Sequence, residues 1–517
     1  MRTSVLFLSL SASLAPASYA IQLPFKVPFF SSQAVHDDTG SGDVSTPRIA
    51  IIGAGAGGSS AAFWIAKAKE RFGLDVEVDV YDKNSYIGGR SITVQPYDNP
   101  DLDPVELGAS IFVRANKNLW RAAQEFNLTL NNFKDEDGET GFWDGEKLYL
   151  TVGSSWWDTL KMLWRYGVNA PRRTQALVKT MINDYLSLYS SDTPKWDDIA
   201  SLAKTLGFLD MTGSTAADYF QSNGVSAQFV NEVIEAATRV NYGQNVDKIH
   251  GLEGAVSLAP DGAAQVKGGN FQIFEKFLNY SHAKVYLDTT VTSIVPKSSS
   301  WVVNSDKGSK QYKGVIFAAP LHQTGIELPS SIVSQVPEQP YVHLHVTLLS
   351  TTSPTVNPEY LSLPPGTKVP ATLLTTYQGA REGGKVPEFN SLSYHGKLSD
   401  NEWSVKIFSE ERISDQWLNK TFNDQVGWVY RKEWDAYPQL PPTTRFPPVK
   451  LDNAFYYVNA FEPFISTMET ETIASRNIVD LLLNELFKSS ICGPRLSAPG
   501  GDDKKKAKDD FVYGWDC

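Results

Sequence analysis

The sequence predicts an α/β fold with more than one domain. The chain has 517 residues and 42% of them are hydrophobic, so it is too long to fold around a single core and too apolar to be disordered. Strand-like and helical stretches alternate near the two ends of the chain, which is typical of a parallel sheet covered by helices. The first of these strand-like stretches is followed directly by a dense run of glycines, which predicts a Rossmann-like domain.

A complete βαβ unit supports this prediction. Residues 48–52 (RIAII) form a short β-branched run, as expected for a buried parallel strand. Residues 59–71 carry apolar side chains at helical spacing, and residues 76–81 alternate as a second strand that ends at Asp82. Residues 53–58 (GAGAGG) join the first strand to the helix, which is the position of a dinucleotide-binding loop.

Each part of this unit has a physical role in binding a dinucleotide. Gly53 allows the tight turn, Gly55 lets the backbone approach the pyrophosphate, and Gly58 admits close packing of the helix against the strand. The helix N-terminus then faces the phosphates. Asp82, 24 residues after Gly58, is placed to accept hydrogen bonds from the adenosine ribose. A glycine-rich loop without a ligand is the alternative, and the flanking strands, helix and acidic residue argue against it.

Residues 87–90 (IGGR) bear on the choice between NAD and FAD. Gly88 and Gly89 let the chain pass close to the other side of a long dinucleotide, and Arg90 can contact its phosphates. In these residues the chain resembles the flavin-containing amine oxidase superfamily, in which an acidic residue and then GGR follow the first βαβ unit. The resemblance implies FAD as the cofactor.

Other segments resemble the same superfamily. Residues 106–110 (ELGAS) resemble the segment beside the flavin ring, residues 291–294 the strand that covers the adenine, and residues 312–320 a strand near the cofactor. Residues 456–462 and 468–470 resemble the final strand and the helix start that close the site, where backbone N–H groups would face the flavin pyrimidine. This closing segment contains no Cys or His, so we expect FAD without a covalent link. The cofactor-binding residues that the resemblance implies are Gly53, Gly55, Gly57, Gly58, Asp82, Gly88, Gly89, Arg90, Gly108, Ala109, Ser110, Val291, Ala318, Glu462, Met468 and Glu469.

Within this superfamily, the chain is most similar to the prenylcysteine oxidases and their plant relatives, the farnesylcysteine lyases. The resemblance covers most of residues 48–487, and the segments that carry it are residues 239–244, 254–258, 267–270, 319–322 and 456–477. Phe461, Thr470 and Ser475 stand where ordinary amine oxidases have glycines. These departures favour the narrower family.

The narrower resemblance implies oxidation of the thioether in farnesylcysteine or geranylgeranylcysteine, which are left when prenylated proteins are degraded. The carbon between sulfur and alkene would lose hydride to the flavin, because both neighbours stabilise the resulting cation. Water would add, the hemithioacetal would collapse to free cysteine and a prenyl aldehyde, and dioxygen would reoxidise the flavin to give hydrogen peroxide. His322 could activate the water, although a histidine after a strand is also a common structural residue.

Two other classes of function stay open on the sequence. One is a secreted flavin oxidase that acts on amines or amino acids. The other is a lipid-binding glycoprotein that has lost its flavin, and the intact GAGAGG, Asp82 and GGR set argues against it. His343 and His345 alternate on one face of a predicted strand, but no third ligand is identifiable, so no metal site is predicted.

The domains follow from these segments. Residues 48–111, 254–321 and 447–490 are expected to form the FAD-binding domain, and residues 112–253 and 322–446 an inserted α+β substrate domain. The substrate domain contains an aromatic stretch at helix-compatible spacing, made of Trp156, Trp157, Leu160, Leu163, Trp164 and Tyr166. Each of these residues alone is typical of a buried core. Together they permit an apolar tunnel, and an amphipathic helix here could also rest on a lipid surface.

The two ends of the chain predict a soluble protein of the secretory pathway, in a lysosome or vacuole or outside the cell. Residues 1–20 are typical of a signal peptide, with an apolar N-terminal strand or helix as the alternative. Residues 21–47 are expected to be a flexible arm and residues 491–517 a solvated tail. Glycosylation motifs begin at Asn127, Asn279 and Asn419. The only cysteines, Cys492 and Cys517, allow one disulfide but no cysteine metal site.

The expected partners are a small lipidated cysteine and dioxygen. The formal net charge of −11 argues against nucleic acid. The sequence identifies no protein partner.

Overall fold

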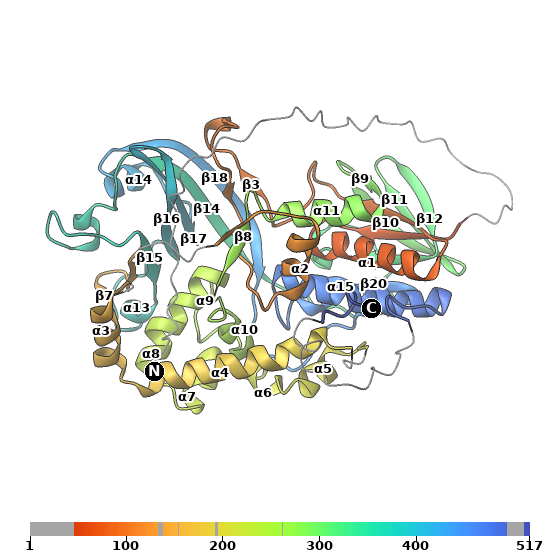
Figure 1. Ribbon diagram of the computed structural model, residues 1–517, viewed down its shortest axis with the longest axis horizontal. Coiled ribbons are helices and arrows are strands. Elements are labelled where there is room, and N and C mark those ends of the chain that lie inside the picture. Colours follow the sequence, from red (N-terminus) through yellow and green to blue (C-terminus); the bar gives the residue numbers. More distant parts are fainter. Residues whose placement is uncertain (1–45, 133–137, 154, 192–194, 261, 494–510) are drawn as a thin grey trace.

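The structure is a computed structural model that describes residues 46–132, 138–153, 155–191, 195–260, 262–493 and 511–517. The expected signal peptide and nearly all of the expected arm lie outside these residues. The molecule has two parts, each built around one large sheet (Figure 1). No helix in the described ranges is long and apolar enough to cross a membrane.

The nucleotide-binding part contains a six-stranded sheet in the order β19-β20-β13-β1-β2-β9. Its central strand β1 is parallel to both neighbours, with Ile52 opposite Tyr81 of β2 and Phe317 of β13. The glycine-rich loop leads from β1 into α1, so the predicted Rossmann-like α/β fold is confirmed. The elements are β1 (Arg48–Ile52), α1 (Ala56–Phe72), β2 (Glu77–Tyr81), α11 (Phe271–Ser281), β9 (Lys284–Tyr286), β13 (Gly314–Phe317), β19 (Lys450–Asp452), β20 (Phe455–Tyr457) and α15 (Met468–Phe487), with a three-stranded sheet of β10 (Val291–Lys297), β11 (Ser300–Ser305) and β12 (Gly308–Tyr312).

The second part contains a seven-stranded sheet in the order β18-β14-β17-β16-β15-β6-β7. Alternate residues of β14 enter different hydrophobic clusters, with Leu349 on one face and Leu344 and Val346 on the other, so the sheet is buried on both faces. The strands are β6 (Thr140–Trp143), β7 (Leu148–Val152), β14 (Tyr341–Thr351), β15 (Thr372–Thr375), β16 (Ser391–Ser399), β17 (Glu402–Ser409) and β18 (Val426–Pro438).

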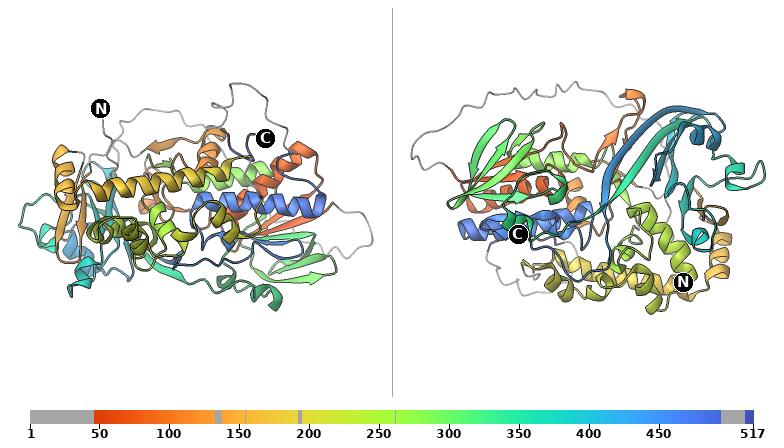
Figure 2. Two further views of the ribbon diagram at one scale, coloured as in Figure 1. Left: turned by 90° about the horizontal axis from the view of Figure 1, so that it is seen from below. Right: turned by 180° about the vertical axis from the view of Figure 1, so that it is seen from behind.

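A layer of helices runs along one side of both parts (Figures 1 and 2). Its long helix α4 extends from the second sheet toward α15, and the segment after α4 is fastened to α15 by a hydrogen bond from Arg476 to the carbonyl of Leu188. The helices of this layer and of the second part are α3 (Trp156–Tyr166), α4 (Asn169–Leu186), α5 (Ile199–Thr205), α6 (Leu209–Thr212), α7 (Ala216–Ser222), α8 (Ala227–Phe229), α9 (Glu235–Tyr242), α10 (Gly251–Val256), α13 (Gln378–Arg381) and α14 (Asp415–Thr421). The short helix α12 (Ser330–Val333) belongs to the nucleotide-binding part, because Gln335 after it donates to the carbonyl of Leu451 on β19.

Some expected domain boundaries do not coincide with the packing. Helix α2 (Lys117–Glu125) contacts α11 and α15 of the nucleotide-binding part, although it follows the expected boundary at residue 112. The expected boundary between residues 253 and 254 falls inside α10, which packs against α4, α6 and α7. Sequence periodicity indicates that a helix has a buried face but does not show which neighbour covers it.

Residues 511–517 are packed, which corrects the expectation of a solvated tail for this stretch, while residues 494–510 of the expected tail lie outside the described residues. The ring of Trp515 lies 4.8 Å from that of Phe63 and 5.6 Å from that of Trp64, both on α1. A disulfide joins Cys517 to Cys492, which follows α15. Residues 511–517 therefore complete the core around α1.

Candidate functional site

The glycine-rich loop between β1 and α1 has no room for a side chain at two positions. Gly53 has a φ of 106°, and a Cβ there would lie 2.4 Å from the carbonyl oxygen of Ala318. A Cβ on Gly58 would lie 1.8 Å from the carbonyl oxygen of Gly53. Gly55 differs, because the nearest atom that its Cβ would meet is the Cα of Gly89, 3.8 Å away. The protein itself therefore leaves one side of Gly55 open.

The second glycine pair runs beside this open side. Gly88 forms an isolated parallel bridge with Gly55, and its N–H donates to the carbonyl of Ala54 over 3.0 Å. Gly88 and Gly89 have φ values of 120° and 60°, which favour glycine. Two backbone segments without side chains thus lie together, and a pyrophosphate can approach both of them.

Asp82 lies just beyond the carboxyl end of β2, as its position in the motif predicts. Its carboxylate accepts hydrogen bonds from the N–H groups of Ala54 and Asn84, both over 2.8 Å. Burial raises the pKa of this carboxyl group. The N–H of Thr289 donates to the carbonyl of Asp82, two residues before Val291 begins β10. Asp82, the expected ribose ligand, therefore lies next to the glycine-rich loop and close to the start of β10, the strand expected to cover the adenine.

Arg90 is bound to a carboxylate in this structure, in place of the expected phosphate contact. Its guanidinium forms an ion pair with Glu462 and donates to the carbonyl of Ala436 over 3.0 Å. The hydroxyl of Tyr341 also donates to Glu462, whose side chain is 2% exposed. The closing segment therefore brings a buried negative charge to Arg90. The spacing of the sequence motifs did not predict that Arg90 and Glu462 form an ion pair.

Glu471, which the sequence analysis did not single out, faces the glycine-rich loop from α15. One of its carboxylate oxygens lies 3.0 Å from the place of a Cβ on Gly57. The other is buried and has no hydrogen-bond partner among the described residues. Burial, together with the charge of Glu462, raises the pKa of Glu471, which favours the protonated form of this carboxyl group. An unpartnered buried oxygen beside the loop fits a polar ligand held there.

Glu469 turns away from the loop, although the resemblance implied a cofactor contact. Its carboxylate accepts hydrogen bonds from the N–H groups of Asn118 and Leu119 over 2.8 and 2.9 Å, and from the hydroxyl of Tyr189. These N–H groups belong to the first turn of α2, where a negative charge is favourable. Its side chain therefore connects α15 to α2.

The first turns of α15 are fastened beside the glycine-rich loop. Met468 is the first residue of the helix, and its N-cap Thr467 accepts a hydrogen bond from the N–H of Thr470. The hydroxyl of Ser475 donates to the carbonyl of Gly57 over 2.6 Å. Thr470 and Ser475, which replace glycines of the ordinary amine oxidases, thus cap the helix and hold it to the loop.

The segment of residues 106–110, which the resemblance placed beside the flavin ring, runs against the backbone of Arg90. A Cβ on Gly108 would lie 2.1 Å from the carbonyl oxygen of Arg90 and 2.9 Å from the ring of Trp434. The N–H of Ala109 donates to the same carbonyl over 3.3 Å. Ser110 is half-buried at the end of the segment.

A buried lysine from the second sheet reaches this segment. The Nζ of Lys406 on β17 donates to the carbonyl of Glu106 over 2.8 Å. Burial lowers the pKa of Lys406. The side chain of Glu106 accepts a hydrogen bond from the N–H of Asn270 over 2.6 Å. No sequence pattern predicted the position of Lys406, because a single lysine within a strand is normally exposed.

Ala318 lies beside the glycine-rich loop, whereas His322 lies at the surface. The N–H of Ala318 donates to the carbonyl of Ile52 over 2.8 Å, at the carboxyl end of β1. His322 is exposed, and its Nε2 lies 2.7 Å from the carbonyl oxygen of Val336. This contact is structural, and no observed contact supports a catalytic role for His322.

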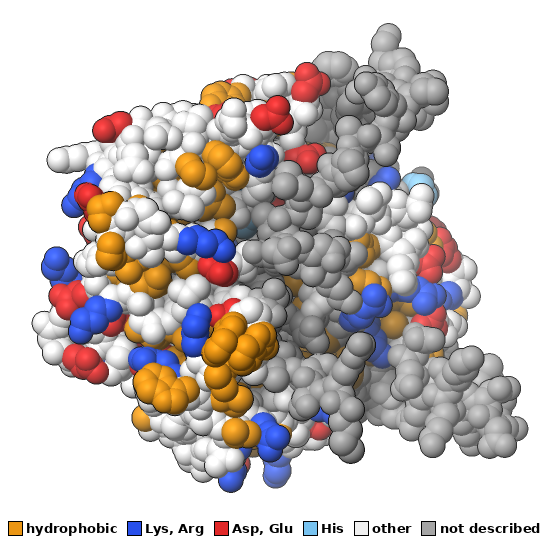
Figure 3. Space-filling model, turned by 60° about the vertical axis from the view of Figure 1, so that its left-hand side comes forward, with side chains coloured by type: hydrophobic (Ala, Val, Ile, Leu, Met, Phe, Trp, Pro, Cys, Tyr) orange, Lys and Arg blue, Asp and Glu red, His pale blue; other side chains and the backbone are white. Residues whose placement is uncertain are grey.

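Helix α3 turns its three tryptophans outward, which corrects the expectation that they line a buried core or tunnel. The exposed fractions of Trp156, Trp157 and Trp164 are 64%, 57% and 88%. The buried face of the helix is formed by Asp158, Met162 and Tyr166. On the face that Figure 3 turns forward, large hydrophobic side chains lie beside Lys and Arg side chains.

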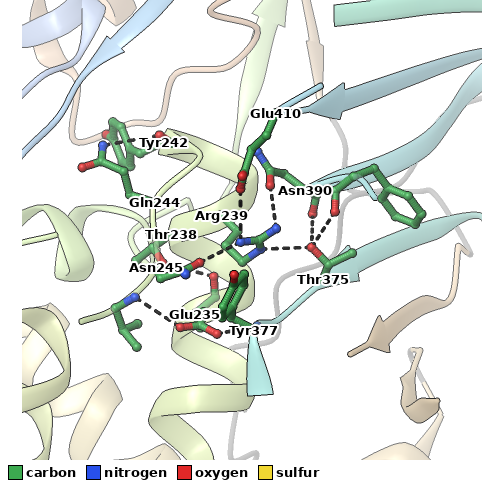
Figure 4. A network of polar contacts seen from close by, with 12 residues as sticks. Glu235, Thr238, Arg239, Tyr242, Gln244, Asn245, Thr375, Tyr377, Asn390 and Glu410 are labelled. Carbon is green, nitrogen blue, oxygen red and sulfur yellow. Dashed lines mark hydrogen bonds and ion pairs between the residues drawn. The ribbon is translucent and has the colours of Figure 1, made fainter. Parts of the chain in front are cut away.

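A buried arginine joins α9 to the second sheet (Figure 4). The side chain of Arg239 is 1% exposed, and its guanidinium donates to Asn245 and Asn390 over 2.7 Å and to Thr375 over 3.1 Å. Glu410 lies 3.7 Å from it. Arg239 opens one of the segments that carry the narrower family resemblance, and its contacts give that segment a structural role.

The fold and the site define a two-domain dinucleotide-binding protein. The open loop at the carboxyl ends of its parallel strands fits a dinucleotide, and the second sheet contributes Ala436, Trp434 and Lys406 nearby. A family model described as an NAD(P)-binding Rossmann-like domain matches residues 51–126. A second model, prenylcysteine lyase, matches residues 150–491. The chain belongs to the prenylcysteine lyase family.

Curated relatives agree with this assignment, and solved structures share the fold. The chain is 31% identical over 473 residues to a farnesylcysteine lyase of Arabidopsis thaliana, which covers 87% of this chain and 91% of the relative. It is 28% identical to prenylcysteine oxidase 1 of Homo sapiens, over 83% of this chain and 87% of the relative. Cyclohexylamine oxidase from Brevibacterium oxydans has a similar fold, with a TM-score of 0.56 at 16% identity over 86% of this chain and 100% of that one. A fatty acid isomerase from P. acnes has a TM-score of 0.58 at 13% identity, over 85% and 99%.

Proposed function

We propose that the protein is an FAD-dependent oxidase that cleaves the thioether of prenylcysteines into free cysteine, a prenyl aldehyde and hydrogen peroxide. The single observation that carries this proposal is the family match over residues 150–491, joined to an intact dinucleotide site. The open side of Gly55 and the unpartnered oxygen of Glu471 fit a bound dinucleotide. The paired glycines at residues 88–89 and the oxidase fold favour FAD, which we expect to be non-covalent, over NAD.

The reaction needs little acid–base chemistry from the chain. One prenylcysteine, one dioxygen and one water give one cysteine, one aldehyde and one hydrogen peroxide. FAD, when bound, would accept the hydride and pass the electrons to dioxygen. The glycine-rich loop and residues 106–110 would position it, and Lys406, buried against that segment with a lowered pKa, could hold or release a proton there near neutral pH.

Farnesylcysteine should bleach the flavin rapidly under anaerobic conditions, whereas its saturated analogue should bind but react slowly. The alkene stabilises the cation left by hydride loss, and the saturated tail lacks this help. Short S-alkyl cysteines should bind weakly, because each buried CH₂ contributes about 0.8 kcal/mol. Stopped-flow absorbance measures the rate of flavin reduction by each compound, and the dependence of that rate on concentration measures binding.

The same experiment distinguishes the remaining alternatives. Under air, cysteine, aldehyde and hydrogen peroxide should appear in equal amounts. A secreted amine or amino-acid oxidase would be reduced by a panel of amines and not by the thioether, and that result would overturn the proposal. Purified protein without any flavin would support the lipid-binding glycoprotein instead.

We further propose that α3 rests on a lipid surface. Its exposed tryptophans form an apolar face, and Lys161, Arg172 and Arg173 supply positive charge near it that suits anionic lipids. The helix is held in this orientation, because Arg165 donates two hydrogen bonds to Glu232 over 2.6 and 2.7 Å. A prenylcysteine has a lipid tail, so its source would be the same surface.

Replacing Trp156, Trp157 and Trp164 together with glutamine should lower affinity for anionic vesicles at least about tenfold, since burying one large apolar side chain contributes about 1.5–3 kcal/mol. Vesicle co-sedimentation measures this affinity. The matched control replaces Val295 and Val386, which are exposed on other elements, with glutamine. Equal loss in both variants would exclude a specific surface on α3.

We also propose that the protein enters the secretory pathway and reaches a lysosome, a vacuole or the medium. Asn127, Asn279 and Asn419 are all exposed in the folded chain, so each is accessible to a glycan. Glycosidase treatment of the protein from its native host should increase its mobility on a gel, and N-terminal sequencing should begin near residue 21. An intact Met1 with no mobility change would contradict this localisation.

A further inference from the structure

Side chains that could bind a metal ion gather on neighbouring strands of the second sheet. His343 and His345 are two residues apart on β14, so they point to the same face. The register of β14 and β18 places Asp435 opposite His343 and Glu433 opposite His345. Donor atoms of His343, His345 and Glu433 all lie within 4.8 Å of one another. The sequence offered no third ligand because β18 lies far along the chain from β14.

We propose that His343, His345 and Glu433 bind a divalent transition-metal ion, and that zinc is the ion. Two imidazoles and one carboxylate form a donor set that zinc accepts, whereas calcium and magnesium prefer oxygen ligands alone. Zinc bonds of about 2.0–2.1 Å place tetrahedral ligand atoms about 3.3 Å apart. Rotation of the exposed side chains of His343 and Glu433 toward the half-buried His345 covers the remaining distance, which is about 1.5 Å between two donor atoms.

Asp435 positions one of the ligands. Its Oδ1 lies 3.1 Å from Nδ1 of His343, which leaves the Nε2 of that ring for the metal. A carboxylate that holds the second nitrogen of a ligating histidine is a common feature of zinc sites. Side chains of His343 and Glu433 are 56% and 66% exposed, so an ion can enter from solvent and keep a water ligand.

The metal would link β18, at the edge of the second sheet, to β14. β18 is an outermost strand of that sheet and is paired with β14 (Figure 1). Trp434 and Ala436 alternate with Glu433 and Asp435, so they point to the opposite face. There Trp434 lies against Gly108, and the carbonyl of Ala436 accepts a hydrogen bond from Arg90. Zinc binding would therefore stabilise the strand that borders the dinucleotide site.

Titration of the full chain with zinc chloride, followed by calorimetry, tests the proposal. The wild-type protein should bind one zinc ion at this site, and its Tm should rise with zinc concentration. Cobalt(II) should give the visible absorption of a site with nitrogen ligands. The double variant His343→Asn and His345→Asn should lose zinc affinity at least about 100-fold, and Asp435→Asn about 10- to 100-fold.

His282→Asn is the matched control. His282 is a histidine at the C-cap of α11 with a φ of 53°, a conformation that asparagine tolerates, and it lies outside the proposed site. This variant should bind zinc as the wild type does. The double variant should keep the wild-type Tm without zinc, which shows that it folds. No zinc binding by the wild type at millimolar zinc, or unchanged affinity in the folded double variant, would overturn the proposal.

Discussion

Replacing Gly55 with leucine should yield a folded protein that contains no flavin. Gly55 has an extended backbone with a φ of −79°, which leucine adopts without strain. A Cβ at this position meets no protein atom closer than 3.8 Å, so the backbone around Gly55 leaves room for a Cβ. The leucine would instead fill the space through which the pyrophosphate approaches the loop. Visible absorbance after gel filtration measures bound flavin, and circular dichroism measures the fold.

Gly58→Ala separates this effect from general damage to the loop. A Cβ on Gly58 would lie 1.8 Å from the carbonyl oxygen of Gly53, so even alanine must displace backbone. We expect this variant to be insoluble or strongly destabilised, in contrast to Gly55→Leu. A yellow, fully loaded Gly55→Leu protein would show that the cofactor does not pass this residue.

Arg239→Met should lower the free energy of unfolding by about 3–5 kcal/mol. Methionine keeps much of the apolar stem, but it leaves buried polar atoms of Asn245, Asn390 and Thr375 without the guanidinium as a donor. The loss should appear as a lower urea midpoint and a lower Tm.

The control for this variant is Arg412→Met, which changes an exposed arginine in the loop after β17. An exposed substitution of this kind should change the free energy of unfolding by less than about 0.5 kcal/mol. Equal effects of the two substitutions would show that the Arg239 network does not hold α9 to the sheet.

The Rossmann-like half of the fold was predictable because its signals are local. A β-branched run, a glycine-rich turn, an amphipathic helix and a second strand follow one another within residues 48–82. Gly53 and Gly58 are required by close backbone approaches, Gly58 to the carbonyl of Gly53 and Gly53 to that of Ala318. Only glycine fits such close approaches, so these positions can be recognised in the sequence.

The rest of the site depends on contacts between segments that are distant in the sequence. Such contacts produce little recognisable sequence pattern. Arg90 meets Glu462 across most of the chain, and Lys406 reaches Glu106 from another sheet. Glu469 and Glu471 are two residues apart on the same helix, yet one caps α2 and the other faces the glycine-rich loop. Only the rotation of α15 about its axis decides between them, and the sequence pattern does not specify that rotation.

For helix α3 too, the sequence pattern did not predict which face is buried. Its side chains at residues 158, 162 and 166 form the buried face, and two of these three are polar or amphipathic. Residue type alone would bury the tryptophans instead. The ion pair of Arg165 with Glu232 orients the helix, and that pairing joins segments 67 residues apart.

The packing of Trp515 against α1 has a consequence for how the protein is made. Helix α1 is synthesised long before Trp515, the side chain that covers Phe63 and Trp64. Domains generally fold during synthesis from the N-terminal end, but this one cannot complete the core around α1 until Trp515 has left the ribosome. Until then the apolar surface of Phe63 and Trp64 stays uncovered by Trp515, so a nascent chain stalled before Trp515 would be a substrate for chaperones.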